Sequence, residues 1–282
     1  MTTPDRALPD WLVAHAREFY DSGKQPVTPR RAATVVLLRE VSGGFEAYTI
    51  KRAASMAFAS GMHAFPGGSV DPRDATGEIQ WVGPAASEWA QRLGLEDESA
   101  ARLVVCAAVR ETFEESGVLL AGLGSNSEGG SGGAAVFGDV SGPEWEADRE
   151  ALVDRRLGFA EFLTNRGLAL RSDLLAGWSR WITPEFEPRR YDTCFFLAAL
   201  PSSQRTRDVG GEADGVAWVK PADAIRQQQR GEIHMLPPTA ATLTELAAHP
   251  TVAAALADSG KRRITPITPR VTFTEEGAHI TV

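Results

Sequence analysis

The run Arg110-Glu-Thr-Phe-Glu-Glu-Ser-Gly117 places three carboxylates at helical spacing. Glu111, Glu114 and Glu115 stand at positions i, i+3 and i+4, so in a helix all three side chains project from one face. Like charges on adjacent turns destabilise a helix, and the C-terminal end of a helix disfavours anions. A divalent cation removes that conflict, because Mg²⁺ prefers oxygen ligands and keeps waters and substrate phosphate oxygens. The run therefore indicates a magnesium site, with Arg110 orienting one of the carboxylates.

The glycines on both sides of this run help to distinguish two interpretations of it, a metal site and a solvent-exposed acidic face. The upstream turn Ala64-Phe-Pro-Gly-Gly-Ser-Val-Asp71 carries Gly67 and Gly68, which let the backbone approach a ligand closely. Downstream, Gly117 ends the helix that is expected over residues 98–116. These two features favour the metal site.

The same residues resemble the box motif of Nudix hydrolases, G-x5-E-x7-R-E-U-x-E-E-x-G-U, in which U is apolar. Gly68 takes the first position, and residues 110–118 take the second half of the motif. Asp74 stands where the first Glu is expected, and Thr112 replaces an apolar residue. Asp74 and Arg110 are 36 positions apart, so about 28 residues are inserted between the two halves of the box. This split box is similar to that of the Nudix enzymes related to the peroxisomal coenzyme A diphosphatases of animals.

The resemblance extends over most of the chain, from about residue 33 to about residue 248. Besides the box it includes residues 53–68, 181–184, 188–193 and 236–239. It implies an α/β (α+β) Nudix fold, in which a mixed β-sheet is sandwiched between helices. The insertion, at about 75–102, is expected to loop out between the halves of the box, because added loop length costs little entropy.

The reaction implied by the resemblance is hydrolysis of a nucleoside diphosphate linked to another moiety, at its pyrophosphate. Mg²⁺ is the expected cofactor, with Mn²⁺ as a substitute, and coenzyme A or an acyl-CoA is the expected substrate. ADP-ribose, NADH and dinucleoside polyphosphates stay open, since one fold serves many substrates. A non-catalytic Nudix module that binds a nucleotide as a regulator is the alternative from another class. Such a module is expected to lose the glutamate face, which is intact here.

Roles for the residues of the box also follow from the resemblance. Glu111 and Glu115 are implied as metal ligands, and Glu114 as a ligand, a water-mediated ligand or the base. The backbone carbonyl of Gly68 is a further candidate ligand to the metal. Gly67 and Gly68 are expected to border the substrate.

Three further residues are expected to support the reaction. Arg110 belongs to the candidate catalytic set together with Glu114 and Glu115, and Asp74 is expected to pair with Arg110. Glu212, in a Gly-rich segment before a predicted strand, is a candidate metal ligand or general base. The alternative for Glu212 is a solvated loop carboxylate.

Basic side chains outside the box are candidates for binding an anionic substrate. Arg52 ends a predicted strand, from which it either reaches the substrate or extends into solvent. Arg189 and Arg190 are adjacent, so in extended backbone they point to opposite faces. One of them is expected to face phosphate and the other solvent.

A few aromatic, histidine and cysteine side chains have two possible roles. His63 precedes the glycine turn and is a candidate for lining the cleft. Phe58, Phe65 and Trp181 stack on a base or pack in the core, and core packing is the default. Cys106 lies in an apolar helical run and is expected to be buried and inert.

Composition excludes several classes of protein. Lys and Arg number 29 against 37 Asp and Glu, giving a net charge of −8, which argues against a nucleic-acid binder. No stretch reaches the ~18 apolar residues of a membrane span. Two cysteines do not make a disulfide framework and fit a reducing compartment. We expect a cytoplasmic protein whose partner is a small nucleotide diphosphate, and the N-terminal helix or the tail leaves room for a homodimer.

The length of 282 residues gives a prior of roughly two domains. The box insertion and a Gly/Ser-rich segment at about 121–143, interpreted as a flexible loop, use much of that length. The chain is therefore expected to form one elaborated domain over residues 1–282, with its core at about 30–250.

Apolar periodicity predicts the remaining elements. Helices are expected over 10–20, 85–93, 98–116, 145–166, 221–229 and 240–248. Strands are expected over 33–38, 45–50, 181–183, 193–200 and 215–219. The tail from residue 264 is expected to add edge strands.

Overall fold

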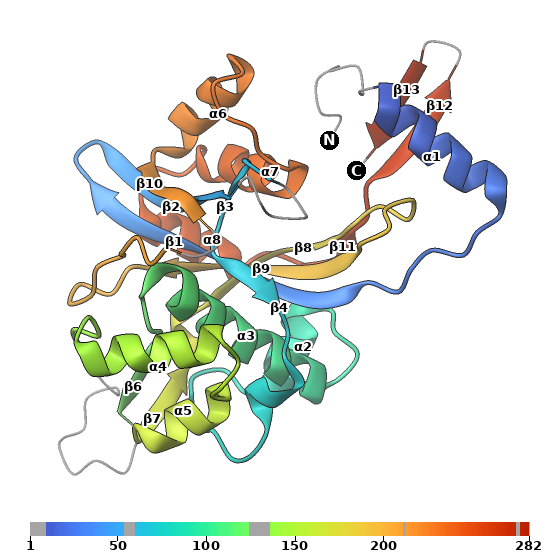
Figure 1. The fold of residues 1–282 in the computed structure, drawn as a ribbon. Helices are drawn as coiled ribbons and strands as arrows, with labels where there is room; N and C mark the ends of the chain where they lie inside the picture. The colour runs from blue at the N-terminus through green and yellow to red at the C-terminus, as the bar shows by residue number, and fades with distance from the viewer. Residues whose placement is uncertain (1–9, 54–59, 124–135, 211–212, 275–276, 282) are drawn as a thin grey trace.

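The computed structural model describes residues 10–53, 60–123, 136–210, 213–274 and 277–281. A mixed β-sheet with helices on both faces forms its centre (Figure 1). The strands follow in the order β10-β2-β1-β9-β8-β11, and β3 and β4 pair with β2 and β1. Their bounds are β1 (Arg30–Val41), β2 (Gly44–Arg52), β3 (His63–Ala64), β4 (Gly67–Ser69), β8 (Ala176–Ile182), β9 (Tyr191–Ala199), β10 (Ala213–Val219) and β11 (Pro266–Ile267). The expected sheet between helices is confirmed.

β1 occupies the centre of the sheet because both of its faces are apolar. Ala33, Val35 and Leu37 point into one core cluster, whereas Val36 and Leu38 point into the other. β1 pairs in parallel with β9 and antiparallel with β2 and β4. A strand buried on both faces needs a continuous apolar run, and the predicted buried strand is confirmed.

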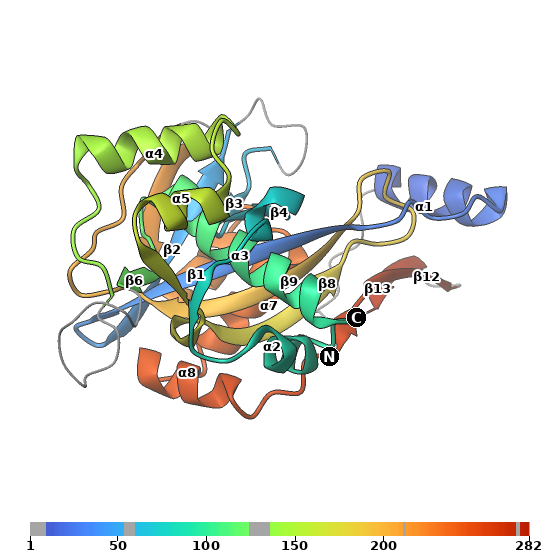
Figure 2. The ribbon, with the colours of Figure 1, turned by 90° about the horizontal axis from the view of Figure 1, so that it is seen from below.

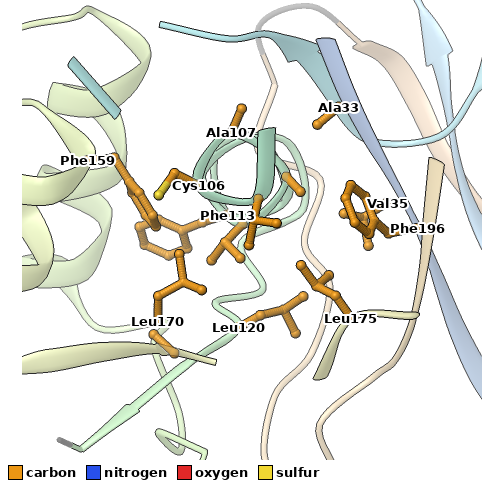
Figure 3. Close-up of a cluster of buried hydrophobic side chains, with 14 of the residues drawn as sticks. Ala33, Val35, Cys106, Ala107, Phe113, Leu120, Phe159, Leu170, Leu175 and Phe196 are labelled. Atoms are coloured by element: carbon orange, nitrogen blue, oxygen red, sulfur yellow. The ribbon is translucent and has the colours of Figure 1, made fainter. Parts of the chain in front are cut away.

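The first core cluster lies between the sheet and the helices α2 to α5 (Figures 2 and 3). α3 packs against β1, and α4 packs against α3. In Figure 3, Cys106 and Phe113 of α3 lie between Phe159 on one side and Phe196 of the sheet on the other. α3 ends at Gly117, whose φ of 69° suits glycine. The bounds are α2 (Ala86–Leu93), α3 (Glu98–Ser116), α4 (Pro143–Val153) and α5 (Phe159–Asn165).

The opposite face of the sheet is covered by α6, α7 and α8 (Figure 1). Leu243, Leu246, Val252 and Ala255 are buried there in the same cluster as Val36 and Leu38 of β1. The predicted helix over 221–229 is confirmed. No part of α8 was predicted. The bounds are α6 (Pro221–Gln229), α7 (Pro237–Leu246) and α8 (Val252–Ser259).

The box insertion does not loop out but packs onto the core. α2 buries Trp89 and Leu93 completely, and the ring of Trp89 lies 5.5 Å from that of Phe196. The insertion also supplies the edge strand of a small sheet, in which β7 pairs with β5 and β6. The strands of this sheet are β5 (Gln80–Val82), β6 (Ala121–Leu123) and β7 (Leu168–Arg171).

The two ends of the described chain come together beside the main sheet (Figure 1). Ala16 of α1 packs with Phe186 and Val271 in a third, small core cluster. In the tail, β11 joins the main sheet beside β8 as expected, but β12 and β13 form a separate hairpin. The bounds are α1 (Asp10–Ser22), β12 (Arg270–Thr274) and β13 (Gly277–Thr281).

Two sequence predictions are wrong in this part of the fold. Residues 145–166 form two helices rather than one, because the chain turns at Arg155, which has a φ of 57°. The loop predicted over 121–143 is wrong at its first three residues, which form strand β6 with Ala121 fully buried. Residues 124–135 lie outside the described residues. Among the described helices, none is long and apolar enough to cross a membrane.

Candidate active site

The last turns of α3 open onto a cavity of about 810 Å³. Glu111, Glu114 and Glu115 all line it, as helical spacing predicts. Gly67 and Gly68 of β4 line the same cavity. The acidic helix end and the glycine turn, 40 or more residues apart in sequence, therefore meet as expected.

Arg110 is the buried centre of this cluster. Its Nε donates to Asp74 Oδ1 at 2.7 Å, and its Nη2 donates to the carbonyl of Ser69 at 2.8 Å. Its Nη1 donates to both carboxylate oxygens of Glu114 at 3.0 Å. Nη1 also lies 2.8 Å from Glu111 Oε1. The predicted pairing of Arg110 with Asp74 is confirmed. One guanidinium thus joins both halves of the split box.

Asp74 is fixed by a short 3₁₀ helix at the start of the insertion, Pro72–Ala75. Asp71 caps this helix, and the backbone N–H of Asp71 donates to Asp74 Oδ2 at 3.0 Å. Burial raises the pKa of Asp74, and the charge and hydrogen bond of Arg110 oppose that shift. The shorter Asp therefore serves where the motif has Glu, because the capped turn brings its carboxylate to Arg110.

Glu111 lies directly against the backbone of Gly68. A Cβ built on Gly68 would stand 2.5 Å from Glu111 Oε1, so any larger residue at this position would displace the carboxylate. Burial raises the pKa of Glu111 to about 8, while Arg110 acts in the opposite direction. A buried carboxylate with a raised pKa is one that a cation would stabilise in its charged form.

Glu115 is held by the same glycine turn. The backbone N–H of Gly67 donates to Glu115 Oε2 at 2.8 Å. Gly67 is itself confined, because a Cβ on it would lie 2.5 Å from the carbonyl oxygen of Ala33 in β1. The close approach of backbone that the two glycines predict is therefore observed.

Glu114 is anchored through its backbone as well as its side chain. Arg149 of α4, which is 6% exposed, donates from Nη1 to the carbonyl of Glu114 at 2.9 Å and from Nε to Glu146 at 2.9 Å. Burial raises the pKa of the Glu114 carboxyl, and the charge of Asp74 adds to this shift. The charge and hydrogen bond of Arg110 and the charge of Arg155 act in the opposite direction.

The chemistry of the donor set suits a hard divalent cation, although two of its carboxylates are engaged with Arg110 and the described side chains do not converge on one point. Three carboxylates and a backbone carbonyl supply oxygen ligands of the type that Mg²⁺ and Mn²⁺ accept. Over the described ranges, no three His, Cys, Asp or Glu side chains converge as a ready ligand group. Arg110 lies between Glu111 and Glu114 and contacts both.

The candidate substrate-binding arginines separate into two groups. Arg52 and Arg189 line the cavity. Arg190 is not among the lining residues: its buried guanidinium donates to the carbonyls of Thr183 and Val27 at 3.0 and 2.8 Å. Arg189 and Arg190 do point in different directions, but the second one is buried rather than solvated.

Several other candidates lie away from the cavity or outside the described residues. Phe65 and Trp181 are buried in the second core cluster, which is the default role. His63 is not among the residues that line the cavity, and burial lowers its pKa. Glu212 and Phe58 lie outside the described residues.

Sequence reasoning missed the helical wall of the cavity. Arg73, Arg149, Arg155 and Phe159 all line it, and none belongs to a motif with known spacing. Arg149 and Arg155 come from the segment that was predicted as one continuous helix, so their convergence on α3 had no signal in the sequence.

Comparison with known proteins decides the family. The family model described as the NUDT19 Nudix domain matches residues 91–246, more than half of the chain. The chain belongs to the NUDT19 Nudix domain family. The match begins within α2 and covers the helical half of the box, and the Nudix fold expected from the sequence is confirmed.

Curated relatives are similar over most of this chain. The acyl-coenzyme A diphosphatase NUDT19 of Gallus gallus is 27% identical over 251 residues, which cover 74% of this chain and 65% of that protein. The putative nudix hydrolase 7 of Caenorhabditis elegans is 26% identical over 224 residues, covering 79% of this chain and 62% of that protein. The chain thus spans less than two thirds of the length of the curated relatives it matches.

A solved structure supports the same fold. The NUDIX hydrolase from Alicyclobacillus acidocaldarius is 29% identical to this chain and superposes with a TM-score of 0.62. The similarity covers 82% of this chain and 96% of that structure.

Proposed function

We propose that this protein is a Nudix diphosphatase that cleaves the pyrophosphate of coenzyme A or an acyl-CoA with the help of Mg²⁺, or of Mn²⁺ in its place. The observation that carries the proposal is the face of three glutamates, Glu111, Glu114 and Glu115, lying with the glycine turn in one cavity. Curated relatives named acyl-coenzyme A diphosphatase support the choice of substrate.

The metal site would be built from both halves of the box. Glu111, Glu115 and the carbonyl of Gly68 are the proposed ligands, and Glu114 is a third carboxylate for a ligand or base. A divalent cation there would neutralise phosphate charge and lower the pKa of a bound water. Arg110 keeps Glu111 and Glu114 oriented through the hydrogen bond and the ion pair that it forms with them.

Hydrolysis adds one water across the pyrophosphate. A bond forms between the water oxygen and one phosphorus, the bond to the bridging oxygen breaks, and two phosphate monoesters leave. For coenzyme A these are 3′,5′-ADP and a phosphopantetheine fragment. Glu114 accepts the proton from water in this proposal, and Glu212 is kept as the other candidate base. Phosphoryl transfer of this kind depends mainly on positioning and charge stabilisation.

Positive side chains around the carboxylates would bind the substrate. Arg52 comes from the end of β2 and Arg189 from the segment before β9, and both line the cavity. Gly67 and Gly68 border it without side chains. The arginines offset the acidic charge of the helix end, so that an anionic substrate can approach it.

The test is a substrate panel followed by mass spectrometry, with coenzyme A, an acyl-CoA, ADP-ribose, NADH and Ap4A, each with and without Mg²⁺. The expected result is Mg²⁺-dependent release of 3′,5′-ADP from coenzyme A. Cleavage of ADP-ribose with coenzyme A untouched would overturn the substrate but keep the reaction. Tight nucleotide binding without turnover of any compound would favour the non-catalytic regulator instead.

A further inference from the structure

α4 ends in a turn that normally takes glycine but here holds an arginine. The N–H of Arg156 bonds to the carbonyl of Ala151 at 2.8 Å, and the N–H of Arg155 to that of Leu152 at 2.8 Å. This is the Schellman motif, whose left-handed position is usually glycine. Arg155 occupies that position with a φ of 57°, and within the described ranges it is the one non-glycine residue with a positive φ. Glycine would end the helix at this position with less backbone strain, so the presence of an arginine suggests a function for its side chain.

The backbone of this turn is tied to the box. Arg73 donates from Nη1 to the carbonyl of Arg155 at 2.9 Å, and its own guanidinium is held by Asp71. Asp71 caps the 3₁₀ helix that presents Asp74 to Arg110. The position of Arg155 relative to the carboxylate cluster is therefore fixed through a chain of hydrogen bonds, while its side chain is exposed.

Arg155 belongs to the wall of the cavity that contains the carboxylates. Its charge acts on the carboxyl of Glu114. Arg73, Arg110 and Arg149 line it too, but each is already bonded to a carboxylate or a carbonyl. For the side chain of Arg155, no hydrogen bond or ion pair is found with any residue in the described part of the chain. Its donors are thus available to a ligand.

The neighbouring Arg156 is different in each of these respects. It pairs with Asp154 at 3.0 Å on the surface, and its side chain is 62% exposed. It does not line the cavity. The chain therefore offers an adjacent arginine as a matched control.

We propose that Arg155 binds a phosphate monoester of the substrate, separate from the pyrophosphate that is cleaved at the glutamate face. A phosphate monoester carries a charge of about −1.5 to −2 at pH 7, and the guanidinium fork matches its oxygens. The inference depends on the proposed function, because coenzyme A carries such a group on its ribose and ADP-ribose does not. Arg155 would then determine specificity for substrates that carry a phosphate monoester.

The experiment compares coenzyme A with dephospho-coenzyme A, which lacks only that phosphate. Arg155→Gly is the informative variant, since glycine accepts the backbone of the turn without strain. We expect kcat/KM for coenzyme A to fall about tenfold or more, with kcat/KM for dephospho-coenzyme A changed less than about twofold. Arg156→Gln should leave both values unchanged, and Arg155→Lys should recover part of the loss. The Tm of Arg155→Gly should equal or exceed that of the wild type.

Other outcomes would overturn the inference or the proposed function separately. An equal fall for both substrates, or no fall, overturns the role of Arg155 but leaves a coenzyme A diphosphatase. If the wild type cleaves no coenzyme A, the proposed function fails, and calorimetric binding of 3′,5′-ADP against 5′-AMP decides the inference. A preference for 3′,5′-ADP that Arg155→Gly loses supports it; no preference in the wild type contradicts it.

Discussion

Arg110 shows how much of the site depends on a single side chain. It is buried, it contacts carboxylates from both halves of the box, and it also donates to a backbone carbonyl. A planar guanidinium can serve several acceptors in fixed directions, whereas a lysine ammonium is a point charge. Sequence analysis predicted the pair with Asp74, because the motif relates the two positions. The expectation that Arg110 orients one of the three carboxylates is met by Glu114, whereas the bond to the Ser69 carbonyl was not predicted, because it depends on the folded backbone.

Arg110→Lys is therefore expected to destabilise the protein. One ammonium cannot replace the bonds to Asp74, Glu114 and the Ser69 carbonyl together, so at least one buried acceptor loses its donor, at about 1–3 kcal/mol. Urea unfolding measures the change in free energy. Arg39→Lys is the control, since Arg39 forms an ion pair with its side chain 41% exposed and should cost less than about 1 kcal/mol. Equal stability of the two variants would contradict this role.

The two glycines of the turn should respond differently to alanine. In Gly68→Ala the new methyl meets the Glu111 carboxylate at 2.5 Å, so Glu111 must move, and a misplaced catalytic group costs about 100-fold in rate. In Gly67→Ala the methyl meets the Ala33 carbonyl at 2.5 Å, so the sheet must move, at about 1–3 kcal/mol. Activity and Tm of both variants provide the check. The account is wrong if Gly68→Ala keeps full activity.

Among the elements, those with local signals agreed best with the sequence. The helix over 98–116 has the bounds that were predicted, because Asp97 caps its start and Gly117 ends it. The break between α4 and α5 could not be predicted, since an arginine stands where the turn normally has glycine. β7 and α8 were missed for another reason. Their sequences are short and apolar, and only their partners in the fold distinguish a strand from a helix.

The box insertion behaves as part of the core in this account. Trp89 is fully buried against Phe196, so Trp89→Ala should cost about 3–5 kcal/mol. Trp11→Ala is the control, because that side chain is 68% exposed and should change stability little. Chemical denaturation of both variants measures the difference. If the insertion were a detachable loop, the two variants would unfold at the same denaturant concentration.

For the whole molecule, we propose that the chain folds as one elaborated domain. The two core clusters lie on opposite faces of one sheet, and the insertion packs onto the first of them. Neither the length nor the composition alone separates one domain from two. The packing of α2 and α3 against each other and against the sheet brings distant parts of the chain together, and local sequence patterns do not predict it.

The two cysteines test that proposal. Cys106 lies in α3 and Cys194 in β9, and both are buried in the first core cluster. Burial raises the pKa of each thiol from its ordinary value of 9.0 to about 12. Both should therefore resist alkylation at pH 8 until the protein unfolds, and both should become reactive at the same denaturant concentration. Labelling with iodoacetamide followed by peptide mass spectrometry measures this; reaction of one thiol well before the other would contradict a single domain.

The raised pKa values of the two thiols also predict how the stability of the protein changes at high pH. A thiol whose folded pKa lies above its unfolded value stabilises the protein below pH 9, and this contribution is lost as pH rises from 9 to about 12. Cys106→Ser and Cys194→Ser should weaken that dependence.

The central claim is that the glutamate face of α3 carries out pyrophosphate hydrolysis. The most direct measurement is the initial rate of 3′,5′-ADP release from coenzyme A in Mg²⁺ by the wild type and by Glu115→Gln, with Glu98→Gln on the exposed first turn of α3 as control. The predicted result is a loss of at least about 100-fold for Glu115→Gln and an unchanged rate for Glu98→Gln. A Glu115→Gln rate within a few-fold of the wild type would contradict the account.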